Sequence, residues 1–236
     1  MSLLLNIDTS LEHASVCLSN GADLLAIEKN FAQKDHASFI QPAIKKLFEK
    51  TVRDIHTLDA IAVAAGPGSY TGLRVGLATA KGLCYALNKP LILLSTLEVM
   101  AVACIKEKSG KEIPHSRLPI SNFLYCPMID ARRMEVFTAI YDHTLRMILK
   151  PQAIILTKTL FDDYLEKYQV IFSGNGSEKF RNLIEHPNAN FINICHSASD
   201  MPELSVKSFA HQRFADVAYS EPFYIKEFFT PKPADR

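Results

Sequence analysis

GPGSYTGLRVG, residues 66–76, is the stretch that says most about the fold. It follows the apolar run LDAIAVAA, residues 58–65, which has the composition of a buried strand. Residues 71–87 contain no proline, and we expect them to form a helix that Pro90 stops. Glycines let the backbone approach a ligand, and a helix N-terminus favours anions. Because the segment does not match the P-loop pattern, its main interpretation is a tight turn, and phosphate binding is the lesser alternative.

A three-stranded antiparallel meander is expected before this segment. The strands are predicted at residues 3–7, 14–18 and 24–28, and Asn20-Gly21 is a strong hairpin signal. A helix follows, because residues 40, 43, 44, 47 and 48 are apolar and share one face of a 3.6-residue period. Asp35 is its expected N-cap, and Pro42 is expected either in its first turn or at a kink.

The rest of the chain continues the alternation of strands and helices. We expect a strand at 91–94, a helix at 96–108, a polar linker at 106–119, and a hairpin of strands 123–129 and 135–141 around residues 130–133. Weaker patterns predict a helix at 160–167, a strand at 170–172, a turn at 174–176, helices from residue 177 and over 204–218, and a loose tail at 229–236. Each half begins with a hairpin whose first strand ends in an aspartate, Asp8 or Asp130.

Composition and charge indicate an ordinary globular protein. The 236 residues allow one large domain or two small halves, and 48% of them are hydrophobic. With 26 basic and 25 acidic residues, the net charge of +1 gives no global reason to expect binding to nucleic acid or membranes. Five scattered cysteines without a CxxC pair indicate free thiols in a reducing cytosol. No apolar run approaches the roughly 20 residues of a membrane span, and the short N-terminal run is expected to be a strand, not a signal peptide.

Small residues recur along the helix expected at 71–87. Gly72, Gly76 and Ala80 are spaced every four residues, and Gly82 adds another small side chain. A glycine inside a helix costs about 1 kcal/mol relative to alanine. Close approach of another element would offset this cost. Spacing alone leaves two alternatives equally open, which are packing within the chain and an interface between subunits.

Polar and glycine-rich turns at several strand ends are candidates for a ligand cleft. An aspartate at a strand end can hold a metal-bound water or order a phosphate loop, but capping of the turn is the more common role. The histidines form no HxxxH or HExxH pair and no GxSxG elbow occurs, so neither a metal site nor a catalytic triad is predicted. The candidate cleft residues are Asp8, Thr9, Ser10, Gly66, Gly68, Asp130, Arg132, Gly174 and Gly176.

Several of these motifs together resemble the TsaB (YeaZ) family. The resemblance is dense over residues 1–141, thin over 142–220, and returns at 221–224, and its most specific part is residues 66–76. One departure is Arg133-Met134, where the family usually has a glycine near the turn. The segments that carry the resemblance are Asp8-Thr9-Ser10, Asp35-His36 with Pro42, GPGSYTGLRVG, Ser95-Thr96-Leu97, IDAR with EVF between residues 129 and 137, and Glu221-Pro222-Phe223-Tyr224.

The resemblance implies an actin-like fold (ASKHA, ribonuclease H-like), an α/β protein of two similar halves with mixed sheets flanked by helices. The expected N-terminal half is 1–104 with about 204–220, the C-terminal half is 105–203, and 221–236 form a tail. The catalytic relatives carry an HxxxH metal site, whose positions correspond to Thr96 and Met100 here. Because a hydroxyl and a thioether are poor substitutes for imidazole, no metal ligand and no catalytic residue are predicted.

The function that the resemblance implies is that of a non-catalytic partner of a TsaD-type threonylcarbamoyl transferase. That enzyme, with a TsaE-type ATPase, modifies the tRNA adenosine next to the anticodon. The family implies a heterodimer with the transferase, a homodimer when the chain is alone, tRNA contact through the complex, ATP and metal on the partner subunits, no membrane and a cytoplasmic location. The expected interface residues are His36, Ile40, Ile44, Leu47, Gly72, Arg74, Gly76, Ala80 and Leu83.

Two further hypotheses belong to the enzyme class. A small ATP-dependent kinase or ATPase of the same superfold would use Asp8 and Asp130, although the chain is short for a sugar kinase. A metalloprotease, suggested by older naming of the catalytic relative, lacks the histidine ligands it would need. For the interface hypothesis, Gly76→Arg or Ala80→Glu is expected to abolish partner binding and to leave the monomer folded.

Overall fold

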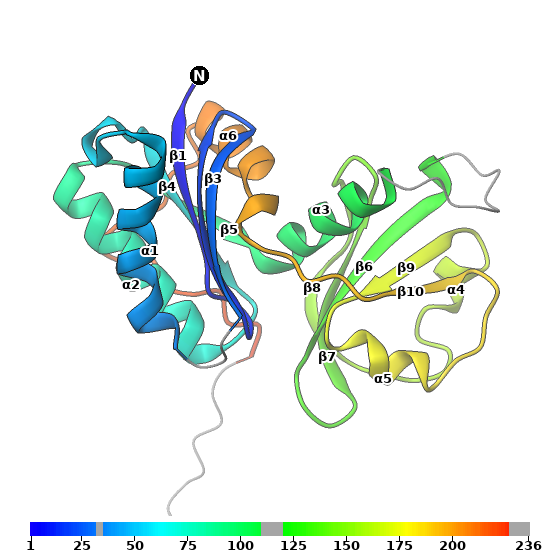
Figure 1. Ribbon diagram of the computed structural model, residues 1–236. Helices are drawn as coiled ribbons and strands as arrows, with labels where there is room; N and C mark the ends of the chain where they lie inside the picture. Colours follow the sequence, from blue (N-terminus) through cyan, green and yellow to red (C-terminus); the bar gives the residue numbers. More distant parts are fainter. Residues whose placement is uncertain (32–34, 110–119, 227–236) are drawn as a thin grey trace, which may run out of the picture.

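Two five-stranded sheets form the core of the molecule, one in each half (Figure 1). The computed structural model describes residues 1–31, 35–109 and 120–226. The strands of the first sheet are β1 (Leu3–Asp8), β2 (Ala14–Asn20), β3 (Asp23–Asn30), β4 (Ala60–Gly66) and β5 (Leu91–Ser95). Those of the second sheet are β6 (Phe123–Asp130), β7 (Glu135–Asp142), β8 (Met147–Ile155), β9 (Gln169–Ser173) and β10 (Ala189–Ile192).

The two sheets share one topology. The first has the order β3-β2-β1-β4-β5, and the second has the equivalent order β8-β7-β6-β9-β10. In each sheet the first three strands of the chain pair antiparallel, and the fourth and fifth add in parallel beside the first. This repeat confirms the predicted actin-like fold of two similar halves with mixed sheets flanked by helices.

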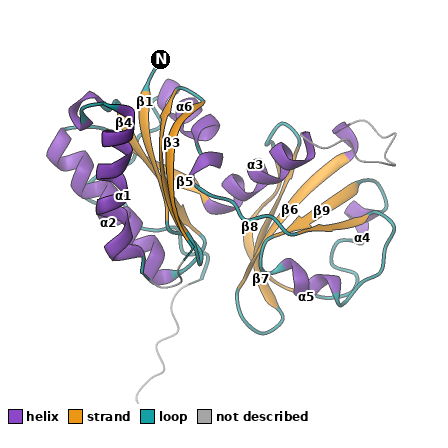
Figure 2. Ribbon diagram, in the orientation of Figure 1, coloured by secondary structure: helices purple, strands orange, loops and turns teal. Residues whose placement is uncertain are grey.

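Helices cover both faces of the first sheet (Figure 2). One face packs against α1 (His36–Thr51) and α2 (Tyr70–Leu87) through a cluster that includes Leu5, Val63 and Leu77. The other face packs against α3 (Thr96–Ser109) and α6 (Pro202–Ala210) through Leu4, Ala62 and their neighbours. Both faces of β1 and β4 are therefore buried, which explains why these strands are apolar at nearly every position.

The helix α3 lies between the two halves (Figure 1). Val99 and Val102 face the first sheet, whereas Leu97 and Met100 face β6 and β7 of the second sheet. This helix is apolar on two sides because it contributes to two cores. In the second half, α4 (Asp162–Leu165) and α5 (Ser177–Arg181) cover the remaining face through a cluster of aromatic rings. The rings are those of Phe161, Phe172, Phe180 and Phe191.

Most of the predicted elements are confirmed. The three opening strands, the Asn20-Gly21 turn, both helices of the first half and the hairpin around residues 130–133 lie where the sequence placed them. Asp35 occupies the N-cap of α1 but makes no side-chain capping bond, and Pro42 lies inside the helix beyond its first turn. The five cysteines are free thiols, as predicted.

In the second part of the chain, two strands lack a prediction and two predicted helices are shorter than expected. Strands β8 and β10 were not predicted, because β8 contains Pro151 without a clear alternation and β10 has only four residues. The last helix ends at Ala210 and not at residue 218, since Gln212 takes a left-handed conformation and Ala215 then pairs with Leu91. The helix expected at 160–167 is a single turn, α4.

Some expectations lie outside what the structure describes. Residues 110–119 of the predicted linker and the predicted tail at 229–236 belong to the undescribed ranges. Across residues 1–31, 35–109 and 120–226, no helix is long and apolar enough to cross a membrane.

Candidate functional site

The glycine loop between β4 and α2 packs on the end of β1. The backbone N–H of Ser69 donates to the carbonyl of Ser10 at 2.7 Å. A Cβ on Gly68 would come within 2.2 Å of that same carbonyl oxygen. The Ser69 hydroxyl caps α2 by accepting from the N–H of Gly72 at 3.3 Å. The loop is therefore a tight turn that close packing within the chain requires. This agrees with the main interpretation of the sequence.

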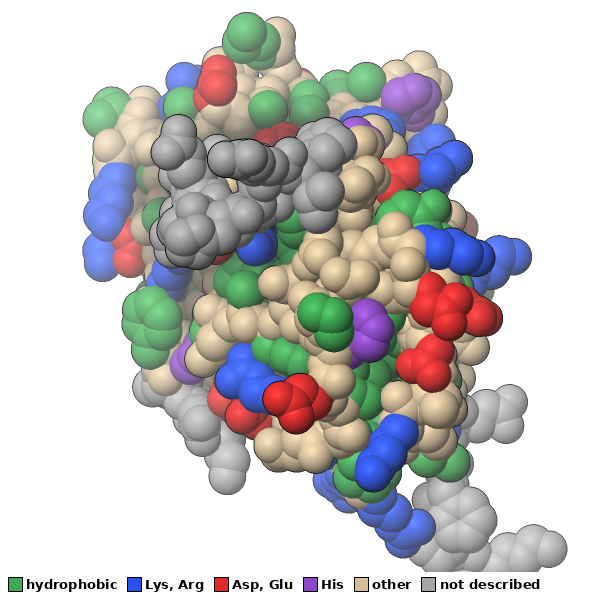
Figure 3. All heavy atoms as spheres, turned by 90° about the vertical axis from the view of Figure 1, so that its right-hand side faces the viewer, with side chains coloured by type: hydrophobic (Ala, Val, Ile, Leu, Met, Phe, Trp, Pro, Cys, Tyr) green, Lys and Arg blue, Asp and Glu red, His purple; other side chains and the backbone are tan. Residues whose placement is uncertain are grey.

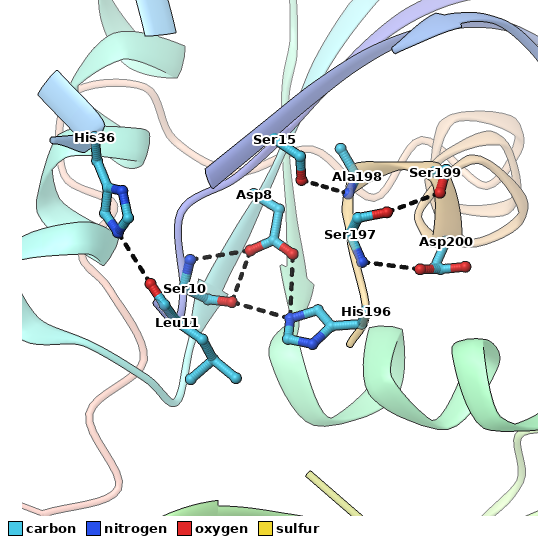
Figure 4. Close-up of polar contacts among 10 residues, drawn as sticks. All are labelled: Asp8, Ser10, Leu11, Ser15, His36, His196, Ser197, Ala198, Ser199 and Asp200. Carbon is cyan, nitrogen blue, oxygen red and sulfur yellow. Dashed lines mark hydrogen bonds and ion pairs between the residues drawn. The ribbon is translucent and has the colours of Figure 1, made fainter. Parts of the chain in front are cut away.

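A buried ion pair joins the end of β1 to a distant part of the chain (Figure 4). The Asp8 Oδ2 lies 3.1 Å from Nε2 of His196, and the two side chains are 3% and 6% exposed. The Asp8 Oδ1 accepts from the backbone N–H and the hydroxyl of Ser10, at 2.9 and 2.7 Å. Both carboxylate oxygens are thus occupied by partners within the chain. The backbone two residues after His196 is also held on the first sheet, because the Ala198 N–H donates to the Ser15 hydroxyl at 2.8 Å.

This pair is not a catalytic triad. The Ser10 hydroxyl donates to Asp8, and the same His196 Nε2 that contacts Asp8 lies 3.3 Å from Ser10 Oγ. A triad needs the aspartate and the serine on different imidazole nitrogens, so that the ring can take the serine proton. The arrangement instead fastens the segment that returns from β10 onto the first half.

The electrostatics of the pair favour its charged form. Burial by itself raises the pKa of Asp8. The His196 charge and the hydrogen bonds from His196 and Ser10 lower this pKa by more than burial raises it, so the net pKa lies below its ordinary value. Burial likewise lowers the pKa of His196, and the charges of Asp8 and Asp200 more than reverse this, so its net pKa is raised. The pair is therefore expected to be ionised at neutral pH.

A pH dependence of stability follows from these directions. The stabilisation that Asp8 contributes to the folded state is present above the pKa of an unfolded aspartate, about 3.9. The stabilisation that His196 contributes is complete below the pKa of an unfolded histidine, about 6.5. Wild-type stability relative to an Asp8→Asn/His196→Gln variant should therefore be greatest between about pH 4 and 6.5. It should decline as pH rises through the raised pKa of His196. Thermal unfolding of both proteins from pH 4 to 9 measures this, and a constant difference would contradict it.

A cavity of about 780 Å³ lies between the halves. Four turns contribute to its lining, which are the β1–β2 turn at Leu11, the glycine loop at Gly68, the β6–β7 turn and the β9–α5 turn. The N-terminal ends of α1 and α2 and one residue of β7 supply the rest of the lining. Asp130 and Arg132 line it, and Asp130 Oδ1 accepts from the Arg132 N–H at 2.6 Å and from Lys179 at 2.5 Å. The turns that hold the sequence-predicted cleft candidates therefore contribute to one cavity.

The remaining cleft candidates are buried or closely packed against other atoms of the chain. Asp8, Thr9 and Ser10 are buried and do not line the cavity. A Cβ on Gly174 would lie 2.3 Å from the Met100 methyl carbon and 2.4 Å from the Met128 carbonyl oxygen. Gly66 and Gly176 are also closed by atoms of the chain, at 2.5 Å from Phe223 O and 2.9 Å from Val136 Cγ1. Close packing within the chain therefore accounts for glycine at these positions.

The positions that correspond to a metal site in catalytic relatives are buried in the core. Thr96 is fully buried, and Met100 packs in the apolar cluster between α3 and the second sheet. No group of three or more histidine, cysteine, aspartate or glutamate side chains that could hold a metal occurs among the described residues.

The predicted interface residues on α1 and α2 mostly face inward. Ile40, Ile44 and Leu47 are at most 3% exposed and belong to the core of the first half. A Cβ on Gly76 would lie 2.3 Å from Thr9 Oγ1, and Ala80 is fully buried. A Cβ on Gly72 would lie 2.1 Å from the Thr9 carbonyl oxygen. The His36 Nε2–H donates to the Leu11 carbonyl at 2.9 Å, beside the cavity. The expectation that Gly76→Arg or Ala80→Glu leaves a folded monomer is therefore wrong, because this stripe packs on the chain's own sheet.

A second small-residue stripe of α2 faces outward. Ala78, Gly82 and Ala86 are exposed, and a Cβ on Gly82 would meet no atom within 4 Å. Beside this stripe, a groove of about 690 Å³ runs between the end of α1 and α2. Leu83, half-buried, lines the groove together with Ile44, Phe48, Val52 and Ile55.

The segment after α6 returns along the other side of α2. Arg74 Nε donates to the Tyr224 hydroxyl at 3.1 Å, and its guanidinium lies 3.9 Å from the centre of the Tyr70 ring. Lys81 donates to the carbonyls of Ala218 and Ser220. Arg74, which the sequence predicted at an interface, is therefore already engaged within the chain.

Comparison with known proteins identifies the family. Residues 28–226 match the family model described as TsaD, tRNA N6-adenosine threonylcarbamoyltransferase. The chain belongs to this family. Within it, the chain is a TsaB (YeaZ) family member, 28% identical over 233 residues to "tRNA threonylcarbamoyladenosine biosynthesis protein TsaB" of Bacillus subtilis (strain 168), with 94% of this chain and 93% of that protein covered.

Other TsaB family members show the same extent of similarity. The protein of that name from Escherichia coli (strain K12) is 24% identical over 230 residues, covering 94% of each chain. The solved structure of YeaZ from Pseudomonas aeruginosa superposes with a TM-score of 0.75 at 23% identity, covering 95% of this chain and all of that one. A second solved structure, described as an uncharacterized protein with similarity to peptidase YEAZ from Pseudomonas aeruginosa, reaches 0.82 at 23% identity over 96% of this chain and all of its own. These likenesses show that the TsaB family fold extends over nearly the whole chain.

Sequence reasoning missed two of the residues that organise this site. His196 lies 188 positions from Asp8, and nothing local marks it as the partner of that carboxylate. Tyr224 had a signal, because Glu221-Pro222-Phe223-Tyr224 is a motif of the TsaB family, but its contact with Arg74 could not be read from spacing.

Proposed function

We propose that the chain is a non-catalytic, cytoplasmic subunit that binds and activates a TsaD-type threonylcarbamoyl transferase in tRNA modification. The observation that carries the proposal is Gly82. A glycine in the interior of a helix costs about 1 kcal/mol relative to alanine. Gly82 gains no packing in return from the residues that the structure describes, since none of their atoms lies within 4 Å of its Cβ position. With Ala78 and Ala86 it presents a smooth surface on which a second helix can pack closely.

The transferase is the partner that best suits this surface. The family model of the transferase matches residues 28–226, a range that includes all of α1 and α2. The transferase is therefore expected to present two equivalent helices. Two related chains can pair through the same face around an approximate twofold axis, as identical chains do in symmetric dimers. The same argument allows a homodimer when the transferase is absent.

In this proposal the transferase and the TsaE-type ATPase carry out the catalysis. The Asp8 carboxylate already pairs with His196 and Ser10, which supports neither the kinase nor the ATPase alternative. The Ser10 and His196 geometry gives no support to a peptidase. We propose that ATP and metal bind to the transferase and the TsaE-type ATPase, and that this chain contributes a binding surface.

We further propose that tRNA is contacted mainly through the assembled complex. The face of the second half in Figure 3 carries lysine and arginine side chains interspersed with aspartate and glutamate. Phosphate backbones are bound by clustered positive charge, and a mixed surface provides little of it. The net charge of +1 agrees with this.

The proposal is tested by mixing the chain with a TsaD-type transferase and measuring the mass of the complex by light scattering after size exclusion. We expect a one-to-one complex that forms at micromolar concentrations or below. The chain alone is expected to form a homodimer that the transferase replaces. Two separate peaks with unchanged masses at high concentration would contradict the proposal.

A further inference from the structure

The helix α1 ends on a residue whose conformation is unusual for its type. Val52 has φ 51° and ψ 46°, the left-handed region. Its N–H donates to the Glu49 carbonyl at 3.3 Å, and the N–H of Arg53 donates to the Phe48 carbonyl at 3.1 Å, which is a Schellman motif. Glycine is preferred at this position, and a β-branched residue there is a true outlier because its Cβ substituents crowd the backbone.

The end of α2 shows what this position ordinarily requires. Asn88 has φ 54° and ψ 49°, and the Lys89 N–H donates to the Cys84 carbonyl at 3.0 Å. The two helices therefore end in the same motif with the same backbone angles. Asparagine is one of the few residues that adopt these angles readily. Valine at the equivalent point of α1 is thus disfavoured by the local backbone.

The described part of the chain offers the valine side chain almost no packing. Its side chain is 92% exposed, so it buries almost no apolar surface. It stands at the rim of the groove of about 690 Å³, whose apolar lining includes Phe48, Ile55 and Leu83. A strained residue that projects an apolar branched side chain into solvent beside an apolar groove indicates a contact made outside the chain.

We infer that Val52 is a contact residue for the TsaD-type transferase, and that the Schellman turn of α1 presents its side chain to an apolar pocket of that partner. This inference rests on the proposed function. The transferase is the occupant because its family model spans α1, α2 and the turn between them, so its own helices can meet this surface in a paired arrangement. Val52 and Gly82 would then contact the same partner. Val52 contributes a projecting side chain, and Gly82 contributes a position without a side chain at which the partner can approach the helix.

The test is Val52→Gly, for which stability and binding change in opposite directions. Glycine relieves the left-handed strain, so the melting temperature should rise by about 2–4 °C. It also removes the apolar side chain, so the dissociation constant for the transferase should increase about tenfold or more. Asn88→Gly is the matched control at the equivalent turn, and it should leave binding unchanged. Val52→Thr keeps the branched Cβ, and it should leave the melting temperature nearly unchanged and weaken binding several-fold.

The outcomes separate this inference from the proposed function. Unchanged binding by Val52→Gly, in a protein that does bind the transferase, overturns the role of Val52 and leaves the proposed function standing. A fall in melting temperature overturns the strain argument, because Val52 would then be structural. Weaker self-association with unchanged transferase binding identifies a second copy of the chain as the occupant and also overturns the inference. If the wild-type chain does not bind the transferase at all, the proposed function itself fails.

Discussion

Gly82→Arg is expected to abolish binding to the TsaD-type transferase and to leave the isolated chain fully folded. Gly82 lies in the interior of α2, and within residues 1–31, 35–109 and 120–226 no atom comes within 4 Å of its Cβ position. Arginine is a better helix former by up to about 1 kcal/mol, so the melting temperature should stay the same or rise slightly. The long charged side chain would separate two helices that need to pack closely, and we expect a loss of affinity of about a hundredfold or more.

The measurement is titration calorimetry with the transferase, together with thermal unfolding of the chain alone. Ala210→Arg is the matched control, because it places the same side chain on the exposed end of α6, on the opposite face of the first sheet. It should bind like the wild type. Full binding by Gly82→Arg would show that the outward stripe of α2 is not the interface.

Gly76→Arg is expected to prevent folding. A Cβ alone would lie 2.3 Å from Thr9 Oγ1 and 3.4 Å from Val63 Cγ2, where neither neighbour can move aside. The Thr9 hydroxyl is fixed by donating to the Gly72 carbonyl at 2.7 Å, and both neighbours are fully buried. Loss of more than about 4 kcal/mol is expected, in line with severe overpacking of a core.

Circular dichroism and the yield of monomeric protein measure this effect. Gly82→Arg serves as the control for adding an arginine to the same helix. A folded Gly76→Arg chain with an unchanged melting temperature would contradict the inward orientation of the 72–76–80 stripe. It would also return that stripe to consideration as an interface.

These two positions show where sequence reasoning reaches its limit. Spacing shows that Gly72, Gly76 and Ala80 share a face of α2, but it does not show what that face contacts. The helix carries a second stripe of small residues with the same spacing at 78, 82 and 86, and only the tertiary structure shows which of the two is covered by the sheet. The prediction chose the stripe with more glycines, which is the one that close packing on β1 and β4 requires.

The fold itself could largely be predicted. Strands β1 and β4 are recognisable as continuous apolar runs because both of their faces are buried, and the glycine loop marks the junction of β4 with α2. Strands β8 and β10 could not be predicted in the same way. They lie at the two edges of the second sheet, and their residues are mostly half-buried or exposed, so they carry little hydrophobic pattern.

The candidate site was predicted only in outline. The turns after β1, β4, β6 and β9 all contribute to the lining of the cavity, since the carboxyl ends of parallel neighbours meet at one edge of each sheet. The contents of the site depend on contacts between distant residues. His196 forms an ion pair with Asp8, and the Phe223 carbonyl packs against Gly66. Local sequence gives no measure of such long-range contacts, so a nucleotide cleft and an internally packed junction look alike at that level.

The central claim is that the chain activates the transferase without catalysing the reaction. The most direct measurement is the amount of threonylcarbamoyladenosine formed in tRNA, determined by mass spectrometry of digested nucleosides, in reactions with the transferase, the TsaE-type ATPase and an activated threonylcarbamoyl donor. The account predicts modification when this chain is present, little or none when it is omitted, and none with the chain alone. Modification by the chain alone, or a full rate by the transferase without it, would contradict the account.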